Sequence, residues 1–312
     1  MSLEMIACDF DTGIHEFEIF RCAQCGLTQT RIVDEQIVDS AYSSSYYGST
    51  TSKFLAFFEN LVIRENRRRA QRILNAYRRR AGTSAPPRVL DIGCGRGLLL
   101  ESLHRLGADC TGLERESFPL TEKPGFRMHV GTLADSEFDG RLFHIIVIWH
   151  VLEHMDDLQQ VLSFLQTHLC DDGLVVVSVP NYSSWQSRLF GRHWFHLDLP
   201  RHLLHFRREW LLSTLQATGL KVLSESTFSA SQNYFGFIQS ACNWLSPGAP
   251  NRLYGLLKFR RRIHEWIPLL GWSCIGACLL PFAILESLCA EPLKRGATLT
   301  LFLGRNREDI PS

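Results

Sequence analysis

Apolar residues follow two different spacings between residues 85 and 229. Short runs that are almost wholly apolar, such as FHIIVIWH, have the length of buried strands. Between these runs lie segments whose apolar residues stand three and four positions apart, such as DDLQQVLSFLQTHL, and this spacing is typical of helices. Regular alternation of strands and helices predicts an α/β fold, with a mostly parallel sheet covered by helices on both faces.

The same reading can be extended along the whole chain. It predicts strands at PRVLDIG, DCTGLE, RMHVGTL, FHIIVIWH, GLVVVSVP, LKVLSEST and GATLTLFLGR, and an alternating strand at EFEIFR near the start. It predicts helices at GRGLLLESLHRLG, DDLQQVLSFLQTHL and REWLLSTLQATG, and a longer one with a basic polar face over residues 53–80.

These elements divide the chain into five segments. We expect an N-terminal extension at 1–45, a helical lid at 46–84, a core at 85–229, a hydrophobic insertion at 230–296, and the last core strand with the tail at 297–312. The proline-, glycine- and serine-rich stretch AGTSAPP separates the lid from the core.

Composition excludes few classes of protein. The 312 residues are 45% apolar and 21% charged, as in an ordinary globular protein. A net charge of +1 favours no class of partner, and we expect no nucleic-acid partner. Ten irregularly spaced cysteines, after a start without a signal-peptide pattern, predict reduced thiols in a cytoplasmic protein.

The stretch VLDIGCGRG carries the clearest candidate chemistry. Gly93, Gly95 and Gly97 follow a buried strand, where a sharp turn lets a ligand come close to the backbone. The dinucleotide fingerprint needs a glycine at position 98, which is Leu98 here, and this disfavours a dehydrogenase. The Gly-Lys-Ser/Thr of a nucleotide phosphate loop is also absent from this stretch.

An acid ends the next predicted strand. Glu114 closes DCTGLE, and a carboxylate in that place can accept hydrogen bonds from both hydroxyls of a ribose. A glycine loop without a pyrophosphate cradle, followed by such an acid, predicts a nucleoside ligand that lacks pyrophosphate.

Together these motifs resemble a known family. VLDIGCGRG, GLE, GTLADSEF, FHIIVIWHVLEH and LVVVSVPN are similar, in order and spacing, to the successive motifs of class I S-adenosylmethionine-dependent methyltransferases. WFHLDLPRHLLHF resembles a subgroup from cell-surface glycan clusters, and HVLEH resembles quinone-biosynthesis O-methyltransferases. The resemblance implies a Rossmann-like sheet of seven strands and S-adenosylmethionine as the cofactor. His144 departs from the family, which usually has an aspartate there.

The resemblance also implies roles for individual residues. The three glycines, with Cys94, would pass under the methionine and ribose of the cofactor, and Asp91 would lie near its amino group. Glu114 would hold the ribose. The residues expected to complete the cofactor site are Thr132 and Leu133 beside the adenine, and Tyr47, with Tyr46, on the lid.

HVLEH is the candidate catalytic stretch. His150 or His154 is expected to act as general base for an oxygen nucleophile, because histidine titrates near neutral pH. If the stretch is helical, His150, Glu153 and His154 share one face and shape the cofactor pocket or hold a divalent metal. No metal ligand is assigned. His202 and His205 either face the substrate or have a structural role.

The N-terminal extension contains Cys22-x-x-Cys25-Gly26. This pair resembles half of a zinc ribbon from the front of some sugar methyltransferases, but a tetrahedral site needs two pairs. Only Cys8 precedes it, with His15 as a distant candidate, so we expect a degenerate, metal-free ribbon.

The insertion contains WIPLLGWSCIGACLLPFAIL, residues 266–285, which has no charged residue. It has the length of a membrane span. We expect the strands on either side of it to lie side by side in one sheet, which argues against a single crossing. Pro268 and Pro281 favour a broken segment. Basic residues flank the run, at Lys258, Arg260, Arg261 and Arg262 before it and Lys294 and Arg295 after it. We expect a peripheral membrane contact; a buried helical pair and a dimer contact are the alternatives.

The sequence thus predicts a methyltransferase that acts on a small-molecule or lipid-linked acceptor. O-methylation of a glycan, a lipid-linked sugar or a quinone-like phenol is the expected reaction, in the cytoplasm or at the inner surface of the membrane. The alternative function is a non-catalytic S-adenosylmethionine-binding scaffold at a membrane surface.

Overall fold

A computed structural model describes most of the chain. The described residues are 1–9, 15–32, 37, 41, 56–115, 125–135, 138–248, 250–257 and 266–305. Tyr46, Tyr47 and the basic run at 258–262 lie outside them, so the predictions made for these residues stay predictions.

The centre of the molecule is a seven-stranded sheet. Its strands, in chain order, are β4 (Arg88–Ile92), β5 (Asp109–Glu114), β6 (Arg127–Val130), β7 (Phe143–Trp149), β8 (Leu169–Pro180), β10 (Leu220–Ser226) and β11 (Thr298–Arg305). They lie in the order β10-β11-β8-β7-β4-β5-β6. Only β11 runs antiparallel to its neighbours β8 and β10. The predicted mostly parallel sheet of seven strands is confirmed.

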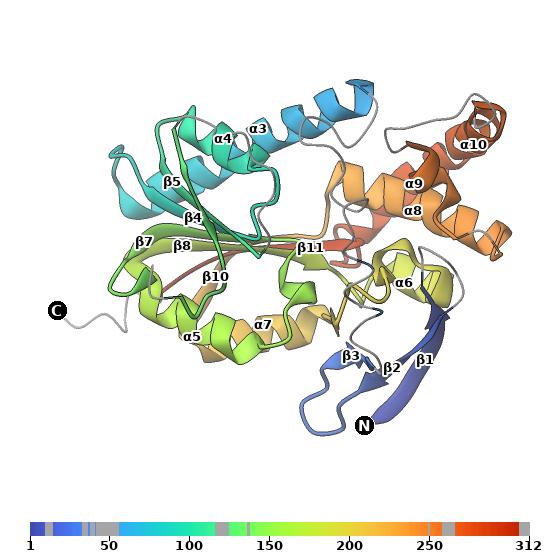
Figure 1. The fold of residues 1–312 in the computed structure, drawn as a ribbon, viewed down its shortest axis with the longest axis horizontal. Helices are drawn as coiled ribbons and strands as arrows, with labels where there is room; N and C mark the ends of the chain where they lie inside the picture. The colour runs from blue at the N-terminus through green and yellow to red at the C-terminus, as the bar shows by residue number, and fades with distance from the viewer. Residues whose placement is uncertain are drawn as a thin grey trace.

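Helices cover both faces of this sheet (Figure 1). On one face lie α3 (Ala56–Ala81) and α4 (Leu98–His104), which pack on the sheet through a core that includes Ile73, Leu100 and Val176. On the other face lie α5 (Leu158–His168) and α7 (Arg208–Ala217), whose core includes Leu162 and Val177. Because each such buried side chain contributes about 1.5–3 kcal/mol, the three-and-four apolar spacing of these helices fixes which side meets the sheet.

A second, smaller sheet was not expected. It is antiparallel, in the order β1-β2-β3-β9, and is formed by β1 (Ser2–Cys8), β2 (Glu16–Arg21), β3 (Thr28–Thr30) and the short β9 (Leu204–His205). Since β9 lies far along the chain, in the segment between β8 and α7, this sheet ties the N-terminal extension to the core. The short helices of the same region are η2 (Leu152–His154), α6 (Trp185–Phe190), η3 (Gly191–His193) and η4 (Phe195–Leu197).

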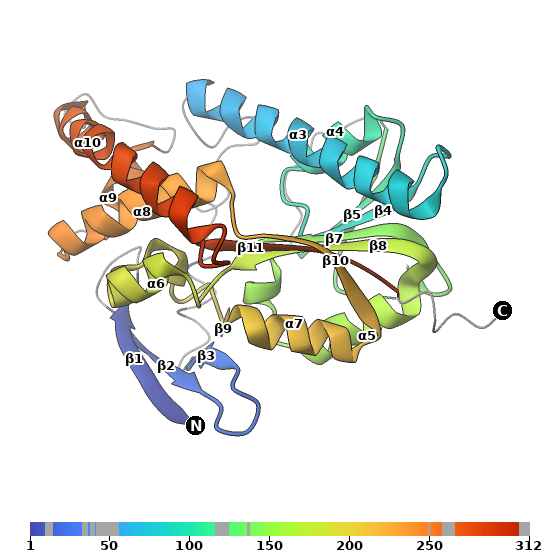
Figure 2. The same cartoon turned by 180° about the vertical axis from the view of Figure 1, so that it is seen from behind.

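The insertion forms a helical lobe at one end of the sheet (Figure 2). It contains α8 (Ala230–Leu245), α9 (Arg252–Leu257) and α10 (Trp266–Ala290). Strands β10 and β11, which lead into and out of it, are hydrogen-bonded neighbours, as the sequence predicted.

The expectation of a segment broken at its prolines is wrong. The helix α10 is continuous and contains Pro281. Pro268 stands in its first turn, where a backbone N–H has no partner within the helix in any case. Pro281 removes only one hydrogen bond, and α10 packs against α8, so the helix persists through it.

Candidate functional site

The glycine loop begins where β4 ends, at the edge of the sheet formed by the carboxyl ends of its parallel strands. The backbone N–H of Gly93 donates to the carbonyl of Leu113 in β5, with 2.7 Å between nitrogen and oxygen. Gly93 has a φ of 70°, and a Cβ at this position would lie 2.3 Å from the side chain of Val151. The turn is therefore possible only with glycine, and it lies directly against the loop that follows β7.

The next glycine faces open space. Gly95 has a φ of 52°, and a Cβ built there meets nothing within 4 Å. The conformation strains any other residue. The empty space above it leaves room for a ligand to approach the backbone.

Glu114 lies beside this loop at the end of β5. It is buried, and its carboxylate accepts hydrogen bonds from two backbone N–H groups. Oε2 is 2.7 Å from the nitrogen of Gly95, and Oε1 is 3.0 Å from that of Arg115. The acid and the glycine loop that were predicted to share one ligand are thus in direct contact.

A pocket opens over the loop, between the sheet and α3. The loop side is lined by Asp91, Gly93, Cys94 and Arg96, and the opposite walls by Asn66, Arg69, Leu98, Leu99 and Trp149. Three of the predicted cofactor residues therefore line one cavity. The helix predicted as part of a lid supplies its basic wall.

Arg69 is a site residue that sequence reasoning missed. Its guanidinium lies 3.7 Å from the centre of the Trp149 ring, and it donates to Asn66 Oδ1 at 3.0 Å. Burial lowers its pKa to about 10. Nothing in RENRRRAQRILNAYRRR distinguishes this arginine from its neighbours, because only the packing of α3 turns it toward the pocket.

Asp91 is the buried acid of the pocket. Burial raises its pKa to about 7, opposed by the charge of Arg69 and reinforced by the charge of Glu114. Asp91 can therefore gain or lose its proton near neutral pH. A cationic ligand group beside Asp91 would favour the ionised form.

Thr132 and Leu133 follow β6 at the same edge of the sheet. Thr132 donates from its N–H and its hydroxyl to the carboxylate of Asp135, which also contacts His129 Nε2 at 2.9 Å. Leu133 packs against the core. The N–H of Gly131 donates to the carbonyl of Glu114, so this loop adjoins the acid predicted to bind ribose.

The stretch HVLEH does not form the helical face considered above. His150 has a φ of 53°, outside helical geometry, and only Leu152–His154 forms a short 3₁₀ helix. His150 Nδ1 lies 3.3 Å from Glu153 Oε1. Its buried Nε2 has no hydrogen-bond partner among the described residues. The left-handed turn after β7 separates His150 from His154 and gives each a different environment.

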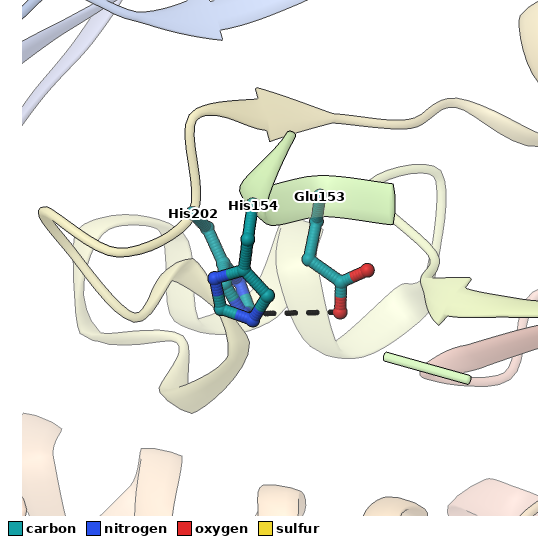
Figure 3. A group of neighbouring side chains, drawn as sticks. All are labelled: Glu153, His154 and His202. Carbon is teal, nitrogen blue, oxygen red and sulfur yellow. Dashed lines mark ion pairs between the residues drawn. The ribbon is translucent and has the colours of Figure 1, made fainter. Parts of the chain in front are cut away.

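His154 turns toward a residue from a distant segment. Its ring centre lies 4.6 Å from that of His202, and its Nδ1 lies 2.9 Å from the carbonyl oxygen of Arg201. Glu153, His154 and His202 offer donor atoms that all lie within 4.8 Å of one another, which suits a metal ion (Figure 3). The structure groups His202, a residue not included in the trio considered from the sequence, with Glu153 and His154, whereas His150 contacts Glu153 alone among them.

Two further predictions concern His205 and the cysteines. His205 is buried in β9, 2.9 Å from the hydroxyl of Thr30, which is the structural role considered above. Cys8, Cys22 and Cys25 are free thiols and form no group of three possible metal ligands within the described residues. Backbone N–H groups of Cys25 and Gln24 lower the pKa of Cys22 to about 7.

Comparison with known proteins identifies the family to which the chain belongs. Residues 63–225, more than half of the chain, match the family model described as "Methyltransferase domain". The ubiquinone biosynthesis O-methyltransferase of Pectobacterium atrosepticum is 29% identical over 125 residues, which cover 36% of this chain and 52% of that protein. The protein of the same name from Bradyrhizobium diazoefficiens is 36% identical over 107 residues, which cover 32% of this chain and 42% of that protein.

These relatives match only in part. The chain spans about half the length of the curated relatives that it matches. A solved S-adenosylmethionine-dependent methyltransferase from Archaeoglobus fulgidus aligns with a TM-score of 0.45 and 16% identity, over 75% of this chain and 93% of that one.

Proposed function

This chain belongs to the class I S-adenosylmethionine-dependent methyltransferases, and on that premise we propose that it transfers the methyl group of this cofactor to an oxygen atom of its acceptor. The observation that carries the proposal is the contact between Glu114 and Gly95 beneath open space. It supports a ribose-holding acid and a backbone that a cofactor can approach. A dehydrogenase lacks support because position 98 is a leucine.

The residues of the pocket fit the charged groups of S-adenosylmethionine. We assign Asp91 to the ammonium group and Arg69 to the carboxylate of the methionine part, because the two side chains line one pocket with opposite charges. Gly93, Cys94, Gly95 and Gly97 are assigned to the methionine and ribose parts, Glu114 to the ribose hydroxyls, and Thr132 and Leu133 to the adenine. Tyr47 is proposed as a further contact from the lid.

His150 is our choice for the general base. Methyl transfer is an in-line displacement, so the chain has to position the acceptor oxygen and remove its proton. In our proposal the proton goes to His150 Nε2, which has no partner among the described residues, while Glu153 holds Nδ1 at 3.3 Å. His154 is a weaker candidate, because its Nδ1 is engaged by the carbonyl of Arg201 and its ring faces His202.

The acceptor is proposed to be lipid-linked or dissolved in a membrane. Within the described residues, one helix is long and apolar enough to cross a bilayer, Leu269–Ala290, and only 22% of its apolar window is buried. Leu270, Phe282, Leu285 and Leu288 are each at least 60% exposed. Exposed apolar side chains cover more than half of the circumference of α10, whereas a dimer contact would cover one stripe.

The lobe is proposed to lie on the membrane rather than to cross it. Strands β10 and β11 hold both ends of the insertion in one sheet, and therefore on one side of any bilayer. The sequence between α9 and α10 contains Lys258, Arg260, Arg261 and Arg262, which suits anionic headgroups. Trp244, 63% exposed at the end of α8, is of the type found at membrane interfaces. We propose a peripheral position on the cytoplasmic face.

The test uses S-adenosylmethionine with a labelled methyl group. The protein and this cofactor are added to a lysate of the source cells, and the transferred label is counted separately in the lipid and aqueous fractions. Gly95→Asp serves as the blank. Its matched control is Gly140→Asp, because Gly140 also has a positive φ and an empty space around its Cβ position but lies in the loop before β7. Label in the lipid fraction, absent with Gly95→Asp and kept with Gly140→Asp, is the expected result. Cofactor binding without any label would favour the non-catalytic scaffold.

A further inference from the structure

Two imidazoles and one carboxylate meet behind the loop that follows β7 (Figure 3). Glu153 and His154 come from η2, and His202 comes from the segment between η4 and β9, almost fifty residues further along the chain. The N–H of Leu203 donates to the carbonyl of Glu153 at 2.8 Å, which holds the two segments together. The arrangement is thus built by backbone contacts and does not depend on flexible side chains alone.

Backbone carbonyls set the tautomer of both histidines. His154 Nδ1 lies 2.9 Å from the carbonyl oxygen of Arg201, and His202 Nδ1 lies 2.9 Å from that of His196. A carbonyl oxygen can only accept, so each Nδ1 carries the hydrogen and each neutral ring has its lone pair on Nε2. This carbonyl anchoring of Nδ1 is the usual arrangement around histidines that bind metal through Nε2.

Glu153 supplies the negative charge. Its side chain is 1% exposed, and Oε1 lies 3.9 Å from His202 Nε2 and 3.3 Å from His150 Nδ1. Oε2 is buried without a hydrogen-bond partner among the described residues. A buried carboxylate oxygen without a partner is costly unless a cation or donor satisfies it.

A nearby second carboxylate is already neutralised. Asp198 Oδ2 lies 3.8 Å from His202 Nε2, but both oxygens of Asp198 accept from the guanidinium of Arg201. The cluster therefore presents two imidazoles and the carboxylate of Glu153, whose charge Arg201 does not pair with in the described residues.

From this geometry we propose that Glu153, His154 and His202 form a binding site for one divalent cation of the zinc class. Two nitrogen ligands and one oxygen ligand suit Zn²⁺, Co²⁺ or Fe²⁺ better than Mg²⁺, which prefers oxygen. Ligand atoms of a tetrahedral zinc site lie about 3.3 Å apart, given bonds of about 2.0–2.1 Å, so the side chains have to close in by about 1 Å. Three protein ligands leave one position for water or an acceptor oxygen.

The site deepens the proposed methyl transfer, on which its functional meaning rests. Glu153 joins the site to His150, and Val151 packs against Gly93 of the cofactor loop. An acceptor hydroxyl bound to the cation would have a lowered pKa and would give up its proton to His150 more readily. The segment that contains His202 would then contribute directly to the choice of acceptor.

Cobalt binding tests the site without any measurement of activity. The full-length, untagged protein is stripped with a chelator and titrated with Co²⁺, and visible absorption is recorded. We expect the strong absorption of four- or five-coordinate Co²⁺, saturating at one ion per chain. Glu153→Gln and His202→Ala should each weaken binding by at least about tenfold. His168→Gln is the matched control, because His168 also contacts a backbone carbonyl but lies outside the cluster, on α5.

Further results separate the alternatives. Only the weak absorption of hydrated Co²⁺ in the wild type would overturn the proposal. So would absorption that disappears with Cys22→Ser and persists with His202→Ala, because it would place the ion on the N-terminal cysteines. Calorimetric binding of S-adenosylhomocysteine by Glu153→Gln confirms that the variant is folded. Cobalt binding in a protein that transfers no methyl group would leave the metal site standing and reject the proposed function alone.

Discussion

The carboxylate of Glu114 accepts a hydrogen bond from the backbone N–H of Gly95, with 2.7 Å between Oε2 and the nitrogen. The acid is thereby held beside the open space above the loop before any ligand arrives. Glu114→Ala should weaken S-adenosylhomocysteine binding by about 10–100-fold, the value of one strong charge-assisted hydrogen bond. Calorimetry checks this. Glu101→Gln, which breaks an exposed ion pair with Arg105 on α4, should bind as the wild type does.

Asp91 makes cofactor binding depend on pH. Burial raises its pKa to about 7, so the group is largely protonated at pH 6 and ionised at pH 8. Only the ionised form attracts the ammonium group, so affinity should rise by about tenfold between these two values. Asp91→Asn should bind weakly and lose this rise. An affinity in the wild type that is equal at both pH values would contradict the assignment of Asp91 to the ammonium group.

His150 should affect turnover and not cofactor binding. Loss of a general base lowers the rate by about 10²–10⁴-fold, so His150→Gln should reduce kcat by that amount and leave the Kd of S-adenosylhomocysteine unchanged. His104→Gln, which alters an exposed histidine on α4, is the control and should keep full activity. If His150→Gln is fully active, the proton leaves by another route.

The exposed side of α10 should bind anionic vesicles. Phe282→Asp combined with Leu285→Asp places two charges where the side chains are now 60% exposed, and co-sedimentation with phosphatidylglycerol vesicles should fall at least about tenfold. Leu142→Asp, at a position 45% exposed before β7, is the control. Binding that survives the double substitution would mean that another surface meets the membrane. A shift from dimer to monomer in the double variant would favour the dimer contact.

Stability should fall in mild acid because of His205. Burial lowers the pKa of His205 to about 3, whereas in the unfolded chain it is about 6.5. The unfolded state thus binds more protons below pH 6.5, and stability is lost as the pH falls through this window, by about 2 kcal/mol at pH 5. Urea unfolding at pH 7 and pH 5 measures the loss. In His205→Gln the loss should be smaller by this amount, whereas His168→Gln should behave as the wild type does.

The sequence by itself determined the sheet and the cofactor loop. Each depends on residues close together in the chain: apolar runs such as FHIIVIWH bury a strand on both faces, and Gly93 and Gly95 allow a turn that other residues disfavour. The position of Glu114 beside the glycine loop could be predicted too, because the parallel strands β4 and β5 bring their carboxyl ends to the same edge of the sheet. Local spacing is sufficient information when the fold repeats one simple unit.

The tertiary structure alone decided which side chains meet across distant segments. Arg69 is one of many arginines on α3, and only helix packing turns it over Trp149. His202 reaches Glu153 and His154 because the chain returns past η2 on its way to β9. His150 likewise has a left-handed backbone conformation, so HVLEH does not form the continuous helix that its residue spacing allowed. Such contacts follow from the packing of whole elements, which no local pattern of residues encodes.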